Sequence, residues 1–450
     1  MKINRPIDVL RNNVSTNVAI VGAGIAGVMT AYFLLKNTDK EVLLIEGNRV
    51  SHGATGHNAG QIVFEFEREF YLLVEKYGLE LAAEAEHAVR NAWVLLEEIY
   101  SDANLSTPMS SFMGYNGYTH MSRILEELKS NALRAEAGLQ VFPIYISKYT
   151  EGADKIPKEY SHLYSLVPHE DVLALLETKD RRYITVISER KGCVNSALLV
   201  EEIAGFLLSK YKGRFLLAED TYISRVILEE GKAVLESGKY RVTAERVVLC
   251  TNGFEKFAIE NNAGDSINVK FHHMVKGLVG YMAGYLEELK EPPTALSFFE
   301  KEHKSHTEAD FLNEKYFYMT RRPYEIEKNE HHNLICTGGP QQVMTDREHY
   351  VPNSEFMKEA ASDIEGFLHK AYARAPKDDI DFKFKWHGLM GFTPTGLRIV
   401  GEEPKNRVLL YNLGCNGIGI LTSIFGGKRI ADILGGARLK PSLFDPVKDY

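Results

Sequence analysis

The stretch VAIVGAGIAGVMTAYFLL, residues 18–35, decides the fold, because it sets three glycines between two apolar segments. Residues 17–21 are short, apolar and β-branched, which predicts a strand, whereas residues 25–37 have the length and composition of a helix. The apolar run EVLLIE at residues 41–46 predicts a second buried strand. A strand, a helix and a strand in this order predict a parallel sheet of the doubly wound class.

The glycines of this stretch form the pattern G-x-G-x-x-G directly after the first strand. Gly22 permits a tight turn, Gly24 lets the backbone approach a pyrophosphate, and the start of the helix favours an anion through its N–H groups and dipole. Glu46 follows Gly27 by 19 residues and can accept hydrogen bonds from ribose hydroxyls, while it would repel a 2′-phosphate. The motif therefore favours FAD or NAD over NADP, the alternative being a glycine turn without a ligand.

Two uncharged runs, residues 18–35 and 408–427, have a second interpretation as a signal peptide or a membrane span. Three glycines interrupt the first run, and two asparagines and five glycines interrupt the second. We therefore read both as strand, tight turn and buried helix, and we expect no transmembrane segment.

Composition, net charge and cysteine spacing limit the classes of protein and partner that fit this chain. The 450 residues are 44% hydrophobic and 25% charged, as in soluble proteins of two or three domains, and the net charge of −8 argues against nucleic acid as a partner. The four cysteines at 193, 250, 336 and 415 form no C-x-x-C pair, which indicates buried thiols in a reducing, cytoplasmic setting and no metal site. Helical periodicity marks residues 65–100, 121–137, 194–208 and 355–374, and strands are expected over 215–249, with a turn at 229–232, and over 267–350.

Three regions carry a family resemblance. The opening stretch with VLLIE and GATGHNAGQI (residues 53–62), the segment KGCVNSALLVEEIAGFL (191–207) with the strands after it, and WHGLMGFTPTGLRIVG (386–401) with VLLYNLGCNGIGILTSIFGGKRIADILGG (408–436) occur in one order. Together they resemble the D-amino-acid oxidase superfamily of flavoenzymes, in the branch of gamma-glutamylputrescine oxidase, glycine oxidase, sarcosine oxidase and dimethylglycine dehydrogenase.

The resemblance implies an α/β fold. A Rossmann-like, glutathione-reductase-like FAD-binding domain would comprise residues 1–112, 190–266 and 385–450. An inserted α+β substrate domain on a mostly antiparallel sheet would comprise 113–189 and 267–384. The implied FAD contacts are Gly22, Gly24, Ile25, Ala26, Gly27, Glu46, Gly47, Ala54, Thr55, His57, Asn58, Ala59, Gly60, Gln61, Ile223, Thr251, Asn252, Gly253, Gly414, Asn416, Gly417, Ile418, Gly419 and Ile420.

The sequence also departs from the family pattern. Cys415 replaces the histidine of G-H-x-x-x-G, Thr395 replaces the aspartate of T-P-D-G, and Met390 stands where glycine oxidase-like members have a carboxylate-binding arginine. Residues 383–400 hold no cysteine for flavin attachment, and NLICTGG at 333–339 lacks the lysine that sarcosine oxidases use toward oxygen. These departures therefore argue against two family properties in this chain: binding of a substrate carboxylate at position 390, and rapid reoxidation of the flavin by oxygen.

His57 leaves two alternatives open. Dimethylglycine and sarcosine dehydrogenases have a histidine at this spacing, in G-S-T-W-H-A-A-G, that bonds to the flavin 8α-methyl carbon. A covalent link through His57 is thus one interpretation of GATGHNAG. The other is a non-covalent imidazole that hydrogen-bonds the pyrophosphate or packs against the edge of the flavin.

Substrate contacts have few candidates. Arg321 and Arg322 in YFYMTRRPYE could clamp a carboxylate, or they are a solvated pair at a strand end. His387 lies near the flavin or is a core histidine. His272 and His273 fit no metal-ligand pattern.

The predicted activity is FAD-dependent oxidation of a C–N bond in a small-molecule amine or amino acid, by hydride transfer to flavin N5 and imine hydrolysis. Oxygen or another acceptor would reoxidise the flavin. The alternatives are a dehydrogenase that reduces a quinone or carrier protein, a non-catalytic flavin-binding assembly factor, and oxidation of a 2-hydroxy acid. The sequence leaves the substrate, the acceptor and the oligomeric state open.

Overall fold

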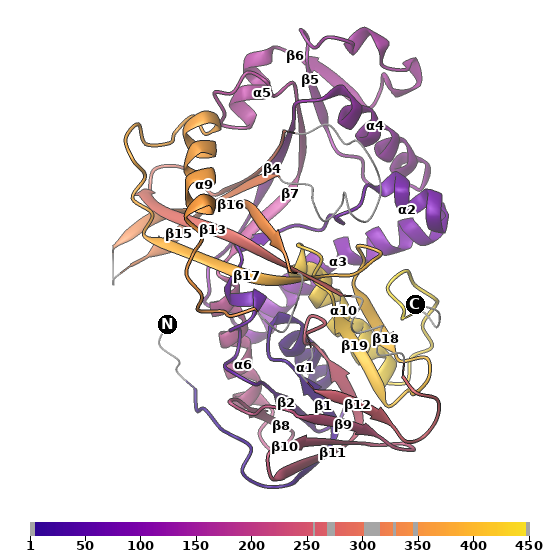
Figure 1. Ribbon diagram of the computed structural model, residues 1–450. Coiled ribbons are helices and arrows are strands. Elements are labelled where there is room, and N and C mark those ends of the chain that lie inside the picture. The colour runs from indigo at the N-terminus through magenta and orange to yellow at the C-terminus, as the bar shows by residue number, and fades with distance from the viewer. Residues whose placement is uncertain are drawn as a thin grey trace.

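The computed structural model describes residues 5–254, 257–267, 275–300, 316–326, 330–344 and 350–446, and it contains two β-sheets with helices packed around them. In Figure 1 the first sheet lies in the lower half of the molecule and the second crosses the upper half.

The first sheet has the strand order β12-β9-β10-β11-β1-β2-β8, with β19 beside β11 and β18 beside β19. Strands β8, β2, β1, β11 and β19 run parallel, so their carboxyl ends share one edge. The strands are β1 (Val14–Val21), β2 (Val42–Ile45), β8 (Phe215–Ala218), β9 (Arg225–Leu228), β10 (Ala233–Ser237), β11 (Tyr240–Leu249), β12 (Ala258–Asn261), β18 (Ile399–Glu402) and β19 (Leu409–Leu413).

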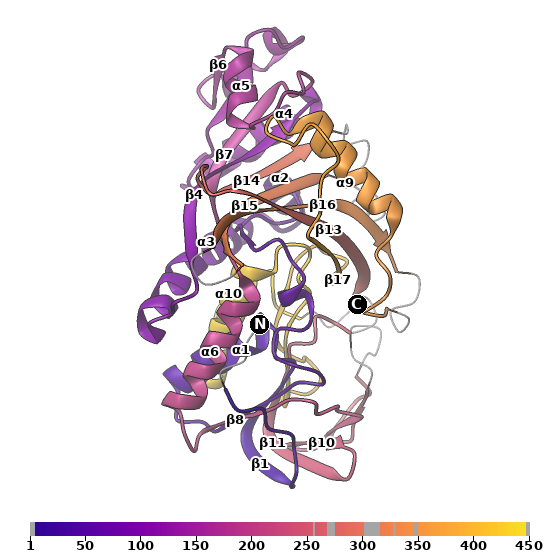
Figure 2. The ribbon, with the colours of Figure 1, turned by 90° about the vertical axis from the view of Figure 1, so that its left-hand side faces the viewer.

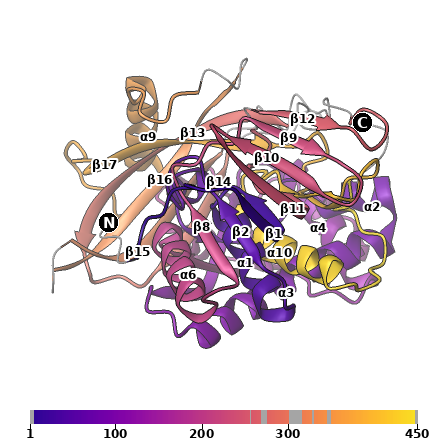
Figure 3. The same cartoon turned by 90° about the horizontal axis from the view of Figure 1, so that it is seen from below.

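Helices cover one face of this sheet, as Figure 3 shows from below, and strands β10, β9 and β12 continue the sheet beyond β11. Helix α1 packs against α6 and α10, and α10 packs against α3. Every residue of α1 from Ile25 to Leu35 is buried, since the helix is enclosed by the sheet and its neighbours. These helices are α1 (Ile25–Asn37), α3 (Leu79–Ala103), α6 (Ser196–Lys210) and α10 (Gly419–Leu434).

The second sheet has the order β17-β13-β16-β15-β14-β4-β7-β5-β6, with β3 beside β7. Its pairs are antiparallel except β14 with β4 and β5 with β6. Its strands are β3 (Gln61–Ile62), β4 (Met109–Tyr118), β5 (Ile144–Ser147), β6 (Tyr164–Val167), β7 (Thr185–Val194), β13 (Lys276–Glu288), β14 (Thr294–Phe299), β15 (Phe317–Glu325), β16 (His331–Val343) and β17 (Phe384–Phe392).

The remaining helices cover the second sheet. Figure 2 shows α9 along the outer side of β13, β15 and β16, where its apolar residues join the core of that sheet. These elements are α2 (Phe70–Tyr77), α4 (Met121–Glu136), α5 (His169–Leu175) and α9 (Lys358–Ala371), with short 3₁₀ turns at Ala54–Gly56, Ala153–Lys155 and Lys158–Tyr160.

The predicted fold class is confirmed: a parallel sheet formed around a β-α-β opening carries a second, mostly antiparallel sheet. The helical periodicity over residues 65–100 corresponds to two helices, because Gly78 has a φ of 85° and ends α2 where α3 begins. The division into domains at the residues given above stays a prediction.

Candidate functional site

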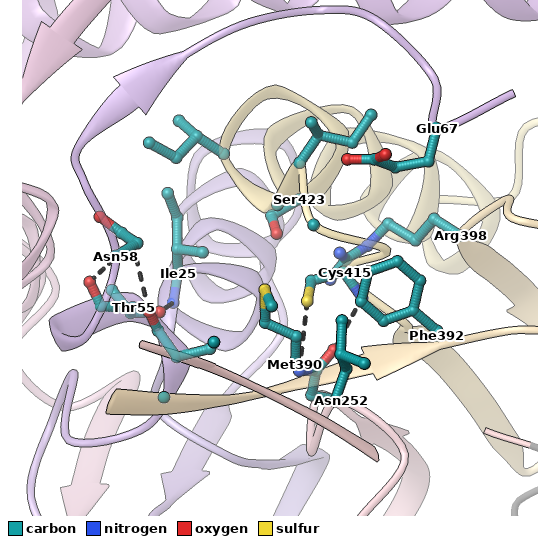
Figure 4. Close-up of a pocket in the computed structure, with 18 of the residues that line it drawn as sticks. Ile25, Thr55, Asn58, Glu67, Asn252, Met390, Phe392, Arg398, Cys415 and Ser423 are labelled. Atoms are coloured by element: carbon teal, nitrogen blue, oxygen red, sulfur yellow. Dashed lines mark hydrogen bonds between the residues drawn. The ribbon is translucent and has the colours of Figure 1, made fainter. Parts of the chain in front are cut away.

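One cavity of about 560 Å³ runs from the carboxyl edge of the parallel strands to the second sheet. The loops that follow β1, β2, β8, β11 and β19 all contribute to its lining, together with β13, β15 and β17. Open α/β sheets bind ligands at this edge, and a volume in this range suits a small-molecule site. Figure 4 shows labelled side chains from several of these loops facing one another.

The glycine turn after β1 has no room for side chains. Gly22 has a φ of +104°, and a Cβ there would lie 2.6 Å from the carbonyl oxygen of Cys250. A Cβ on Gly27 would lie 1.8 Å from the carbonyl oxygen of Gly22. The helix therefore starts directly against the strand, and its N-terminal residues Gly24 and Ile25 line the cavity.

Residues 53–61, a segment of mostly small residues, support the start of α1. The Thr55 hydroxyl accepts a hydrogen bond from the backbone N–H of Ile25 at 2.9 Å, so a residue 30 positions later caps α1. Asn58 ties the segment together: its Nδ2 donates to the carbonyl oxygen of Thr55 at 3.0 Å, and its Oδ1 accepts from Gly60 N–H and from the Ser196 hydroxyl, each at 2.8 Å. Figure 4 shows this bond between Asn58 and Thr55 beside Ile25.

His57 lines the cavity beside β17. Its Nδ1 donates to the carbonyl oxygen of Gly53 at 2.8 Å, since a carbonyl can only accept. A Cβ on Gly388 would lie 2.9 Å from the Cβ of His57, which shows how closely this segment approaches the second sheet. The Nδ1–H tautomer leaves Nε2 as the ring nitrogen with a lone pair.

Glu46 closes the turn from the end of β2. Its two carboxylate oxygens accept backbone hydrogen bonds from Ala23 and Asn48, each at 2.8 Å. Burial raises the pKa of Glu46, and these two hydrogen bonds oppose the rise. The carboxylate lines the cavity, where each oxygen has a further lone pair for a hydroxyl donor.

Asn252 joins the loop after β11 to the loop after β19. Its Oδ1 accepts from the backbone N–H of Cys415 at 2.7 Å, and its Nδ2 approaches the Cys415 sulfur at 3.5 Å, as drawn in Figure 4. Gly417 has a φ of +78°, and a Cβ there would lie 2.6 Å from Glu67 Oε1. At Gly417 the loop therefore presents backbone to the cavity ahead of α10.

The structure brings most of the predicted cofactor residues to this cavity. Those that line it are Gly22, Gly24, Ile25, Ala26, Glu46, Gly47, Ala54, Thr55, His57, Asn58, Ala59, Gln61, Ile223, Thr251, Asn252, Gly417, Ile418, Gly419 and Ile420. Five predicted residues are not in the lining and instead shape its turns: Gly27, Gly60, Gly253, Gly414 and Asn416.

The three substrate candidates lie elsewhere. Arg321 is 1% exposed and donates to both carboxylate oxygens of Glu177 at 2.7 Å, so its guanidinium is engaged in the core. His387 is buried between the Tyr350 hydroxyl at 3.1 Å and the Ser354 hydroxyl at 3.2 Å, which is the arrangement of a core histidine. Among the described residues, the cavity lining does not include Arg321, Arg322 or His387.

Sequence reasoning missed a buried charged cluster at the far end of the cavity. Lys191 is 1% exposed, and its Nζ donates to Asn116 Oδ1 at 2.6 Å and lies 3.2 Å from Glu189 Oε1. Asn116 Nδ2 donates in turn to Glu65 and to Glu189, each at 2.9 Å. Burial, and next the charge of Glu189, raise the pKa of Glu65 well above its ordinary value. Because the members come from β4, β7 and the segment after β3, no local sequence pattern predicts the cluster.

A second missed residue is Arg398, which lines the cavity below the loop that precedes α10. Its signal in the sequence was an arginine in TPTGLRIVG at the position where the family pattern T-P-D-G-x-P-x-I-G has proline.

Neither a metal-ligand cluster nor a membrane-spanning helix is found in the part of the chain that the structure describes. It holds no group of three His, Cys, Asp or Glu side chains arranged to ligate a metal ion. His272 and His273 lie outside the described residues. Within the same ranges no helix combines the length and hydropathy needed to span a bilayer. The four cysteines are free thiols, and three of them are buried.

The geometry fits a dinucleotide such as FAD. The cavity is long, it passes two helix N-termini, and the glycine turn and segment 53–61 admit a ligand close to the backbone.

Comparison with known proteins gives a consistent result. The family described as "DAO: FAD dependent oxidoreductase" matches residues 17–433. Gamma-glutamylputrescine oxidoreductase of Escherichia coli is 31% identical over 77 residues, which is 17% of this chain and spans only 18% of that relative. Glycine oxidase from Geobacillus kaustophilus superposes with a TM-score of 0.65 at 15% identity, over 97% of this chain and all of the other. L-Proline dehydrogenase from P. horikoshii gives 0.66 at 13% identity, over 97% of each chain. At these identities the structural likeness shows the fold.

Proposed function

The chain belongs to the DAO family of FAD-dependent oxidoreductases, and from this membership we propose that it oxidises a C–N bond of an amine or amino acid. One observation carries the proposal: a single cavity connects the glycine turn at the carboxyl edge of the parallel sheet with the interior face of the antiparallel sheet. A cofactor at the first end would meet a substrate at the second.

We assign the FAD site to the lining residues named above. The N-terminus of α1 would hold the pyrophosphate, Glu46 the ribose, and the backbone of Gly417 to Ile420 the flavin end. Reduction of the flavin adds negative charge, and the N–H groups at the start of α10 would stabilise that charge. Segment 53–61 would lie along the cofactor, which accounts for its small side chains.

FAD bound at these residues would supply the acceptor for a hydride from the carbon beside the nitrogen, and hydrolysis of the imine would complete the oxidation. The chain's own contribution is a dry and shaped wall. Leu278 and Met282 of β13 and Tyr318 of β15 line the cavity and are buried or nearly so. Burial raises the pKa of the Tyr318 phenol, so the ring stays neutral and can orient a polar group.

The charged groups of the cavity bear on the substrate class. Met390, a thioether, lies in the lining where glycine oxidase-like relatives would have an arginine. Three lining cations have carboxylate partners within the structure: Arg123 with Glu69, Arg134 with Glu86, and Lys191 with Glu189. With these three cations engaged, amines are favoured over substrates that need one of them as a carboxylate clamp, and both classes belong in the test.

The test is an anaerobic bleaching screen of the FAD-loaded protein. Primary and secondary amines, amino acids, and 2-hydroxy acids are added separately, and the flavin absorbance is followed. We expect bleaching by at least one amine or amino acid. Bleaching by hydroxy acids alone would contradict C–N oxidation, and bleaching by no compound would favour a non-catalytic flavin protein.

The electron acceptor is settled with the bleaching substrate. Oxygen consumption without a dye indicates an oxidase, and reduction of a quinone or dye with little oxygen uptake indicates a dehydrogenase. Tyr318→Phe serves as a control on the site, because it keeps the ring and removes only the hydroxyl; its effect should fall on turnover rather than on FAD content.

A further inference from the structure

Arg398 is a buried cation that its own protein leaves partly unsatisfied. The residue immediately precedes β18 and is 5% exposed. Its Nε donates to Asn412 Oδ1 at 2.5 Å and its Nη2 to the carbonyl oxygen of Asn412 at 3.0 Å. Its Nη1 has no hydrogen-bond partner, and no carboxylate pairs with the guanidinium, within the ranges that the structure describes.

Such an arrangement is unfavourable unless an anion completes it. Burial lowers the pKa of Arg398 to about 10, and the sulfur atoms of Cys415 and Cys250 oppose that change. An unpaired buried charge costs far more than a paired one, and the planar fork of a guanidinium suits a carboxylate or phosphate. The two hydrogen bonds to Asn412 hold the group rigidly without neutralising it.

The position of Arg398 indicates which anion it meets. Asn412, which fixes the guanidinium, also donates to the first two turns of α1 and α10: its Nδ2 lies 3.4 Å from the carbonyl oxygen of Ala26, 3.2 Å from Thr30 Oγ1 and 3.3 Å from the carbonyl oxygen of Ser423. Arg398 therefore sits between two helix N-termini that both line the cavity. In Figure 4 its side chain extends to Cys415, below Ser423 and the turn that begins α10.

We propose that Arg398 is the counter-ion of the FAD diphosphate, with Nη1 as the donor that the bound cofactor satisfies. The proposal rests on the FAD site assigned above and not on the identity of the substrate. It adds a fixed positive charge to the partial charges of the two helix ends, at a position where the family pattern has an uncharged proline.

The experiment compares apoprotein of the wild type, Arg398→Met and Arg398→Lys. Each is titrated with FAD, ADP and riboflavin, with flavin fluorescence as the readout for the flavins and calorimetry for ADP. For the methionine variant we expect affinity for FAD and for ADP to fall about 10- to 100-fold, while riboflavin binding stays within about twofold. The lysine variant, which keeps a charge without the planar fork, should lie between.

A stability measurement separates this role from a purely structural one. Because methionine removes an unpaired buried cation, the apoprotein of Arg398→Met should unfold at the same temperature as the wild type or higher. The gain in unfolding temperature on adding FAD should be smaller for the variant. A structural residue would instead lower the apoprotein midpoint.

Two results would overturn the proposal. One is unchanged affinity for FAD and ADP in the methionine variant. The other is unchanged ADP affinity with weaker riboflavin binding or a lower flavin reduction potential, which would move the contact to the isoalloxazine. A failed substrate screen leaves these titrations unaffected, so the proposal and the proposed activity fail separately.

Discussion

Thr55→Val tests whether the small-residue segment 53–61 holds the start of α1. Valine keeps the shape of threonine and removes the hydroxyl that accepts the Ile25 N–H at 2.9 Å. Thr55 is 7% exposed, so water cannot readily replace the acceptor. A buried donor left without a partner costs about 1–3 kcal/mol, and loss of an N-cap costs about 0.5–2 kcal/mol. We expect the free energy of unfolding of the apoprotein to fall by about 1–2 kcal/mol in urea titrations followed by circular dichroism.

Thr55→Ser is the matched control, because serine retains the hydroxyl and loses one methyl group. Amide hydrogen exchange gives a local readout: the Ile25 N–H should exchange faster in the valine variant and at the wild-type rate in the serine variant. Equal destabilisation by both substitutions, with unchanged exchange at Ile25, would refute the capping argument.

Four further outcomes are expected. Glu46→Ala should weaken FAD binding about 10- to 100-fold, measured by fluorescence titration, because the ribose acceptor of the β2 end is lost; unchanged affinity would contradict that role. Gly417→Val must displace Glu67 and adopt a φ of +78°, so it should shift the flavin spectrum or potential, whereas Gly213→Val, equally strained but with nothing within 4 Å, should leave both unchanged. Because the pKa of Glu65 is raised, the folded chain holds a proton that the unfolded chain has released, and stability is lost as pH rises through the folded pKa. Glu65→Gln should therefore gain stability relative to the wild type as the pH rises above the ordinary pKa of a carboxyl group in denaturation series, and a constant difference would count against this. Acid precipitation should leave the yellow colour in the supernatant; colour in the pellet that His57→Ala releases would establish a covalent link through Nε2, the ring nitrogen that the Gly53 contact leaves open.

The sequence predicted the parallel sheet well because its signals are local. The residues of β1, α1 and β2 are consecutive, and the glycine pattern between them has a direct steric meaning at Gly22 and Gly27. The loop ahead of α10 was recognised for the same reason, since a buried strand, glycines and a helix follow one another there.

The substrate side could not be read in the same way. Arg321 looked like a clamp in its own stretch, yet its partner Glu177 lies 144 residues away and only the folded sheet brings them together. The cluster around Lys191 likewise combines residues from β4, β7 and the segment after β3. Pairing across strands that are distant in sequence decides which charges are free for a ligand, and no periodicity within one strand encodes it.

The place of β19 beside β11 has a consequence for how the protein is made. The chain emerges from the ribosome at about 5–20 residues per second, so roughly 20–80 seconds separate β1 from the strand and helix that complete its sheet. Until α10 arrives, the apolar flank of α1 that it covers stays uncovered in the nascent chain. We therefore expect cofactor loading to be a late event in biosynthesis. A chain truncated before residue 409 would retain the glycine turn but leave the apolar face of α1 exposed, where it could bind chaperones or aggregate.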